Sequence, residues 1–206
     1  MKRRTLAVVD YGAGNLASVL RALTGLGHRC RSTREPAALA AADAVVLPGV
    51  GAFPAAMQAL RQQGLAEALR ERAAQGQPLI GICLGMQLLA DESLEHTPTA
   101  GLGLIPGRVR PLGRPAWHIG WNAIEVADDE PLLAASQGNA LYFNHSFVFD
   151  TPQPYRRALA WADAATPLTA AVRRANVVGL QFHPEKSQAE GRRLLSHVIE
   201  GLCHAA

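Results

Sequence analysis

The sequence has few lysines, few aromatic residues and no long hydrophobic run, and each shortage excludes a class of protein. Lys2 and Lys186 are the only lysines, and aromatic residues make up 5% of the chain. The net charge is +3, but the arginines are scattered, so we expect no nucleic-acid partner. The apolar run at residues 6–9 ends at Asp10, which predicts a cytoplasmic chain without a signal peptide or a membrane span.

Cysteines are also few. Cys30, Cys83 and Cys203 are widely spaced and form no Cys-x-x-Cys pair. An odd number at this spacing predicts neither a disulfide framework nor a zinc site, so we expect no metal and judge each cysteine by its surroundings.

Hydrophobic residues make up 49% of the 206 residues, and their pattern predicts an α/β fold. In the first half, apolar strand-like runs alternate with amphipathic helical patterns. Strands are predicted at residues 6–9, 29–33, 44–47 and 78–82, and helices at 16–23, 65–74 and 84–90. This alternation is typical of a mainly parallel central sheet flanked by helices.

The second half predicts antiparallel additions to that sheet. Short strand-like segments separated by turn residues lie at 122–126, 140–143, 156–161, 169–173 and 177–182, and a last helix begins near Ser187. Because no linker or repeat interrupts the chain, we expect residues 1–206 to form a single domain.

One glycine motif favours an alternative function. Gly12-x-Gly14-x-x-Ala17 lies between a predicted strand and helix, as in dinucleotide-binding proteins, and Glu35 follows at the distance of a ribose-binding carboxylate. A nicotinamide- or flavin-binding protein is therefore the second hypothesis. The motif is weak, since two glycines are common in such turns and Asp10 is bulky where the phosphate turn would begin.

A cysteine stands at the sharpest predicted turn of the chain. Gly81-Ile82-Cys83-Leu84-Gly85 joins a buried strand to a helix, which is typical of a nucleophile elbow. There the helix dipole would stabilise a thiolate, and the Leu84 amide could donate to an oxyanion. The alternative is an inert buried cysteine, the commoner fate of a free thiol.

A histidine and a glutamate supply the partners that a nucleophilic cysteine needs. His183 and Glu185 lie two apart at the end of an apolar strand, where side chains i and i+2 share a face. Glu185 could then hold one ring nitrogen of His183 while the other accepts the thiol proton. Alone, this pair would more often be an ordinary surface pair; with Cys83 it favours thiol chemistry.

The Pro48-Gly49-Val50-Gly51 turn could supply a second oxyanion donor, the Val50 amide, although an ordinary Pro-Gly turn is the alternative. Parallel sheets gather functional loops at the carboxyl ends of their strands. We therefore expect this turn and Cys83 to share one crevice.

These motifs resemble those of the class I, triad-type glutamine amidotransferases and, more closely, the glutaminase subunits of imidazole glycerol phosphate synthase. The matching segments are residues 10–15, 48–53, 81–87, 118–122 and 181–187. The resemblance implies a Cys83 nucleophile, a His183 base and then acid, a Glu185 orienter, and Val50 and Leu84 oxyanion amides. It also implies a site for glutamine formed by Gly51, Gln87, Glu95, His145 and Ser146, with no cofactor.

The resemblance further implies a partner, a cyclase subunit with a (β/α)₈ barrel, docked near Asn15 and Trp121. Two positions depart from the family pattern Pro-His-Met-Gly-Trp-Asn: Trp117 replaces the proline and Ile119 the methionine. These changes concern docking and the ammonia path more than the triad. Three alternatives stay open: another thiol hydrolase such as a cysteine peptidase, a helix-cap role for Asn15, and a core role for Trp121.

Overall fold

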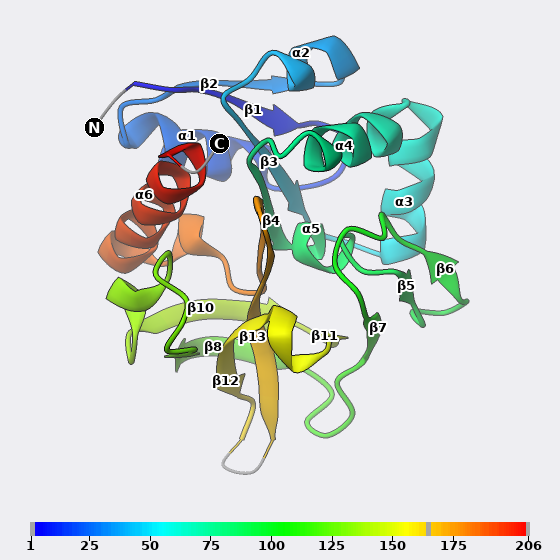
Figure 1. The fold of residues 1–206 in the computed structure, drawn as a ribbon. Helices are drawn as coiled ribbons and strands as arrows, with labels where there is room; N and C mark the ends of the chain where they lie inside the picture. Colours follow the sequence, from blue (N-terminus) through cyan, green and yellow to red (C-terminus); the bar gives the residue numbers. More distant parts are fainter. Residues whose placement is uncertain (1–2, 164–165, 205–206) are drawn as a thin grey trace.

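The computed structural model describes residues 3–163 and 166–204, which are built around an eight-stranded sheet in the order β2-β1-β3-β4-β14-β13-β12-β9 (Figure 1). The first five strands are parallel and the last three antiparallel, which confirms the predicted fold class. The parallel strands are β1 (Thr5–Val9), β2 (Arg29–Thr33), β3 (Ala44–Gly49), β4 (Leu79–Cys83) and β14 (Val177–Leu180). The antiparallel strands are β13 (Pro167–Arg174), β12 (Arg156–Trp161) and β9 (Glu125–Val126).

Helices cover both faces of the parallel strands (Figure 1). The two faces build separate hydrophobic clusters, and β1 contributes Leu6 and Val8 to one and Ala7 and Val9 to the other. The first cluster includes residues of α1 (Leu16–Gly25) and α6 (Gln188–His204), and the second includes residues of α2 (Pro36–Ala40), α3 (Phe53–Gln62) and α4 (Leu65–Ala74). No helix in the described part of the chain is both long and apolar enough to cross a membrane.

The described residues also form two small sheets and three short 3₁₀ helices. One sheet pairs β8 (His118–Ala123) with β10 (Ala140–His145); the other has the order β11 (Phe147–Asp150), β7 (Arg108–Pro111), β5 (Glu92–Ser93), β6 (Thr99–Ala100). The 3₁₀ helices are η1 (Ala134–Ser136), η2 (Gln153–Tyr155) and η3 (Pro184–Lys186).

The helix after Cys83 is shorter than predicted. Only α5 (Leu84–Gln87) is helical, whereas the pattern predicted a helix to residue 90. The backbone carbonyls of Leu88, Leu89 and Ala90 accept hydrogen bonds from the amides of residues 102–105 instead of continuing the helix. Tertiary pairing thus ends this helix after one turn.

Two other local predictions were incomplete or wrong. Helix α3 was not predicted; Pro54 lies in its first turn, where proline is tolerated. Strand β14 ends at Leu180, so the predicted strand does not reach His183.

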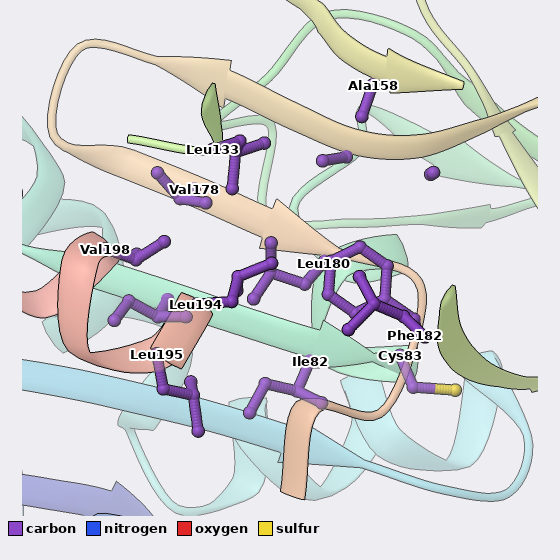
Figure 2. Packing of buried hydrophobic residues seen from close by; sticks show 14 of the residues in the cluster. Ile82, Cys83, Leu133, Ala158, Val178, Leu180, Phe182, Leu194, Leu195 and Val198 are labelled. Atoms are coloured by element: carbon purple, nitrogen blue, oxygen red, sulfur yellow. The ribbon is translucent and has the colours of Figure 1, made fainter. Parts of the chain in front are cut away.

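The turn between β4 and α5 depends on two close backbone approaches. Cys83 has φ 54° and ψ −111°, a conformation that few residues with a side chain adopt. A Cβ on Gly81 would lie 2.6 Å from the Gly85 carbonyl oxygen, and a Cβ on Gly85 would collide with the Leu47 carbonyl. Figure 2 shows Cys83 at the edge of the first hydrophobic cluster, with its sulfur pointing away from Leu194.

This geometry predicts that Gly85→Ala destabilises the chain by at least about 3 kcal/mol, because backbone atoms must move to admit a methyl group. Gly25→Ala is the matched control, since nothing lies within 4 Å of a Cβ there. It should be neutral or stabilise α1 by up to about 1 kcal/mol. Urea unfolding of both variants measures the difference, and equal free energies of unfolding would contradict the prediction.

Candidate active site

A cavity of about 240 Å³ lies where β3 and β4 end side by side, with Gly49 in register with Cys83. Its lining includes eight residues predicted from the sequence to form the site: Val50, Gly51, Cys83, Leu84, Gln87, His145, Ser146 and His183. Three further lining residues, Asn144, Phe147 and Lys186, were not predicted. The crevice expected between the Val50 turn and Cys83 is therefore present.

His183 and Glu185 form a close pair, but not on a strand. His183 precedes η3, and its Nδ1 lies 2.8 Å from Glu185 Oε1. The side chains of both residues are almost wholly buried. The expected pairing is thus reached by a 3₁₀ turn, and the strand geometry used to predict it was wrong. Because a neutral His183 donates from Nδ1 to the carboxylate, Nε2 is left for Cys83.

The pKa of His183 reflects opposing influences. Burial would lower this pKa, but hydrogen bonds and the negative charges of Cys83 and Glu185 outweigh burial and raise it to about 9. At neutral pH the buried ring therefore favours the protonated form, which suits an imidazolium paired with a thiolate.

Two polar groups besides His183 contact the sulfur. The Cys83 thiol donates to the Asn144 carbonyl at 3.8 Å, and Gln181 Nε2 donates to Cys83 Sγ at 3.8 Å. Gln181 is fully buried and does not line the cavity. The sequence contains this residue within the motif around His183, but without the fold nothing in the motif shows that it reaches the cysteine.

A second buried histidine, His145, has a lowered pKa, in contrast to His183, and takes part in a series of hydrogen bonds. Its Nδ1 donates to the Phe147 carbonyl at 2.8 Å, so its Nε2 accepts from His118 Nδ1 at 3.0 Å. Asn122 Nδ2 then donates to His118 Nε2 at 2.8 Å. Burial, with smaller contributions from the charges of His118 and His183, lowers the pKa of His145 to about 4, although its bond to Phe147 opposes this.

Burial also lowers the pKa of His118. Both histidines in the hydrogen-bonded series from Phe147 to Asn122 are therefore neutral at physiological pH. This series connects the cavity lining to β8.

Besides Glu185, which reaches the site through His183, three predicted residues lie outside the cavity lining: Glu95, expected to bind substrate, and Asn15 and Trp121, expected at the partner interface. Glu95 does not line the cavity; instead its Oε2 accepts from the Phe53 amide at 2.8 Å, at the first residue of α3. Asn15 is exposed and caps α1 by accepting from the Ser18 amide at 3.4 Å. Trp121 is half exposed on β8, so it is not a core residue.

The glycine motif near the N-terminus does not offer a phosphate site. Asp10 Oδ1 accepts from the Gly12 amide at 3.0 Å, and Asp10 Oδ2 accepts from Arg34 Nε at 2.9 Å. A carboxylate thus occupies the amide that a phosphate would need. The dinucleotide hypothesis therefore loses its structural basis.

Lys186 is the cavity residue that a closer reading of the sequence could have found, since it is one of only two lysines. Its Nζ lies 5.9 Å from the centre of the Tyr142 ring, within reach of a cation–π interaction. Asn144 and Phe147 line the cavity on either side of the predicted His145–Ser146 segment.

A buried cysteine at a strained strand-to-helix turn, beside a histidine held by a glutamate, is the arrangement of a nucleophilic thiol site. The family model of class-I glutamine amidotransferases matches residues 7–200. A crystal structure of a glutamine amidotransferase superposes with a TM-score of 0.77 at 24% identity, covering 97% of this chain and 98% of that one. The chain belongs to the class I glutamine amidotransferases.

The curated relatives identify the group within this class to which the chain is similar. The chain is 45% identical to "Imidazole glycerol phosphate synthase subunit HisH" of Streptococcus sanguinis, over 95% of each sequence. It is 47% identical to the subunit of the same name from Symbiobacterium thermophilum, over 96% of this chain and 94% of that one. The protein is thus a glutamine-hydrolysing enzyme of the HisH group.

The raised pKa of His183 predicts a pH-dependent stability. Its folded-state pKa of about 9 exceeds the reference value of 6.5. Protonated His183 therefore contributes fully below about pH 6.5 and loses this contribution as the pH rises through about 9. Relative to His183→Gln, the wild-type free energy of unfolding should fall by on the order of 1–3 kcal/mol over this range.

Urea titrations at several pH values measure this difference. The exposed α6 residue His197 provides the control His197→Gln, which should keep the wild-type pH dependence. A difference between wild type and His183→Gln that does not change with pH would contradict the raised pKa.

Proposed function

We propose that Cys83, His183 and Glu185 hydrolyse the side-chain amide of L-glutamine through a cysteine thioester. The Cys83 thiolate, formed by proton transfer to His183, attacks the amide carbon. The resulting oxyanion accepts hydrogen bonds from the backbone amides of Val50 and Leu84. When the intermediate collapses, the C–N bond breaks and His183 protonates the leaving nitrogen, which departs as ammonia.

The second half of the cycle reuses the same groups. Neutral His183 takes a proton from water, the hydroxide attacks the thioester, and collapse expels the Cys83 thiolate and releases glutamate. Glu185 keeps the His183 ring oriented in both halves and stabilises its charged form. The observation that carries this proposal is the buried 2.8 Å pair of His183 and Glu185 beside a cysteine at a strained turn.

Four of the residues that line the cavity bind glutamine: Gly51, Gln87, His145 and Ser146. Gln87 Nε2 donates to the Phe147 carbonyl and to Gln181 Oε1, so its own carbonyl oxygen is the group that it can offer to a substrate amine or amide.

Glu95 was expected to meet the substrate ammonium directly. In this structure its supported role is indirect: it anchors the start of α3, two residues beyond Gly51. This contact would help to hold the turn that carries Val50.

The ammonia is passed to a cyclase subunit, so that the protein acts as the glutaminase subunit of imidazole glycerol phosphate synthase in histidine biosynthesis. The partner, a (β/α)₈ barrel, uses the ammonia to make imidazole glycerol phosphate and releases an aminoimidazole carboxamide ribotide. A closed path is needed because ammonia that reaches bulk water is protonated and is no longer a nucleophile.

A stripe of exposed apolar side chains supports the docking face. Trp117, Ile119 and Trp121 alternate along β8 and its preceding residue and are 63%, 59% and 49% exposed. Val50 at the cavity mouth is 41% exposed. Apolar exposure of this kind is typical of interaction surfaces. We propose that this stripe, with Val50 and Asn15, contacts the cyclase.

We also propose that residues 1–206 form one amidotransferase domain that works in the cytoplasm. The central sheet supports the single domain, because β14 from the second half of the chain lies beside β4 from the first.

Glutamate release from glutamine tests the proposed function, measured with the purified chain alone and then with the cyclase subunit and its nucleotide ligand. We expect strong activation by the partner and a loss of at least about a thousandfold in Cys83→Ala. Activity that does not depend on the partner would remove the histidine-pathway assignment. No activity under any condition, or full activity in Cys83→Ala, would overturn the proposed chemistry.

The docking face makes a separate prediction. Ile119→Glu places a charge in the middle of the stripe and should weaken cyclase binding by at least about tenfold in calorimetric titrations. Leu94→Glu is the control, since Leu94 is also exposed but follows β5, outside this stripe. Unchanged affinity in Ile119→Glu, with normal folding, would mean that the partner docks elsewhere.

A further inference from the structure

We propose that Gln181 belongs to the reaction centre: its side-chain amide donates a hydrogen bond to the Cys83 sulfur and stabilises the thiolate. The inference rests on the proposed role of Cys83 as the nucleophile. Gln181 Nε2 lies 3.8 Å from Cys83 Sγ, and the whole residue is buried. A buried polar amide of this kind is expensive unless its hydrogen bonds are made.

Protonated His183 is the charged partner of the thiolate, and the fold gives the thiolate little other stabilisation from its own turn. The sequence predicted a helix of several residues behind Cys83, whose dipole would stabilise negative charge, but α5 is a single turn. The Asn144 carbonyl oxygen accepts a hydrogen bond from the thiol at 3.8 Å. Once the thiol has lost its proton, this partly negative oxygen faces a negative sulfur and disfavours the thiolate. The sulfur thus has two uncharged hydrogen-bond partners, the Asn144 carbonyl and the Gln181 amide. Only the Gln181 amide is a donor, so only it favours the thiolate.

The orientation of the Gln181 amide is fixed by a chain of hydrogen bonds that starts at Phe147. The Phe147 carbonyl can only accept, so Gln87 must present Nε2 to it, at 3.1 Å. The same Nε2 donates to Gln181 Oε1 at 3.0 Å. With its oxygen held by Gln87, Gln181 has to direct its nitrogen at Cys83. Gln87 is thus a positioning residue for the sulfur, acting through Gln181.

The backbone holds Gln181 in place for this task. Its amide donates to the Ala170 carbonyl of β13 at 2.9 Å, directly after β14 ends. Two residues later, the His183 amide donates to the Tyr142 carbonyl of β10 at 2.8 Å. The same short segment therefore brings two groups to the sulfur: Gln181 as a neutral donor, and His183 as the partner that exchanges the proton.

Alkylation of Cys83 by iodoacetamide tests this role in the full-length chain, since only the thiolate reacts. The rate is measured between about pH 5 and pH 10, by mass spectrometry of the peptide that contains Cys83, so that Cys30 and Cys203 do not contribute. Gln181→Met removes the donor at similar volume, and Gln181→Glu puts a carboxylate in its place.

We expect alkylation near about pH 6.5 to slow about tenfold in Gln181→Met and further in Gln181→Glu. The midpoint of the rate curve should rise in the same order. A residue that served only packing would not produce this order. A wild-type alkylation curve in a folded Gln181→Met variant would overturn the proposal.

Two more variants keep the test decisive. Gln77→Met is the matched control: Gln77 Oε1 accepts from Arg72 near the opposite end of β4, so its loss should leave the Cys83 curve unchanged. If Gln181→Met does not fold, Gln87→Met is measured, because it frees the Gln181 amide to rotate. A smaller shift in the same direction supports the proposal, and no shift contradicts it.

The wild-type protein separates this inference from the proposed function. If wild-type Cys83 reacts no faster than Cys30 and Cys203 at neutral pH, the role of Cys83 as the nucleophile fails, and the inference fails with it. If wild-type Cys83 is reactive and the Gln181 variants match it, only the role of Gln181 fails.

Discussion

The close approach of Gly85 to the Leu47 carbonyl is the contact on which the site depends. It lets β4 turn directly into α5, and the turn holds Cys83 at φ 54°. A non-glycine residue in such a conformation costs on the order of 1–3 kcal/mol, which the packing of both hydrophobic clusters around β4 has to offset. The Cys83 sulfur therefore points away from the labelled core residues (Figure 2), and Cys83 lines the cavity together with Val50.

Two hydrogen-bond networks beside the cavity meet at the Phe147 carbonyl. One runs through Gln87 and Gln181 to Cys83, and the other starts at His145. One carbonyl oxygen therefore fixes the direction of both networks, since it can only accept.

The two buried histidines of the cavity are specialised in opposite ways. Burial and neighbouring charges lower the pKa of His145 to about 4, whereas Cys83 and Glu185 outweigh burial and raise that of His183 to about 9. His145 is thus a neutral structural ring, and His183 is suited to carry a proton. Both face one cavity, so the difference comes from their partners rather than from their depth.

The sequence predicts well what local signals encode. The apolar runs and helical spacing located most of the parallel strands and α4, and the glycines around Cys83 located the strained turn. The alternation of apolar segments also predicted the mixed sheet. These features depend on neighbours within a few residues, which a single sequence displays.

Features that depend on distant contacts were missed or misassigned. Glu95 turned toward the Phe53 amide, 42 residues away, and Gln181 reaches a sulfur 98 residues away. The length of α5 was decided by pairing with residues 102–105. The spacing of residues within one sequence does not predict contacts between residues so far apart. The pairing of His183 with Glu185 was predicted through a strand that the fold replaced with a 3₁₀ turn.

The central claim is that Cys83 forms the covalent bond to glutamine. The most direct measurement is to treat the full-length chain, with its cyclase partner, with the electrophilic glutamine analogue 6-diazo-5-oxo-L-norleucine and to locate the label by peptide mass. The account predicts one label per chain, on Cys83, with loss of activity in proportion to labelling and protection by glutamine. Inactivation with the label on Cys30, Cys203 or any other residue would contradict it.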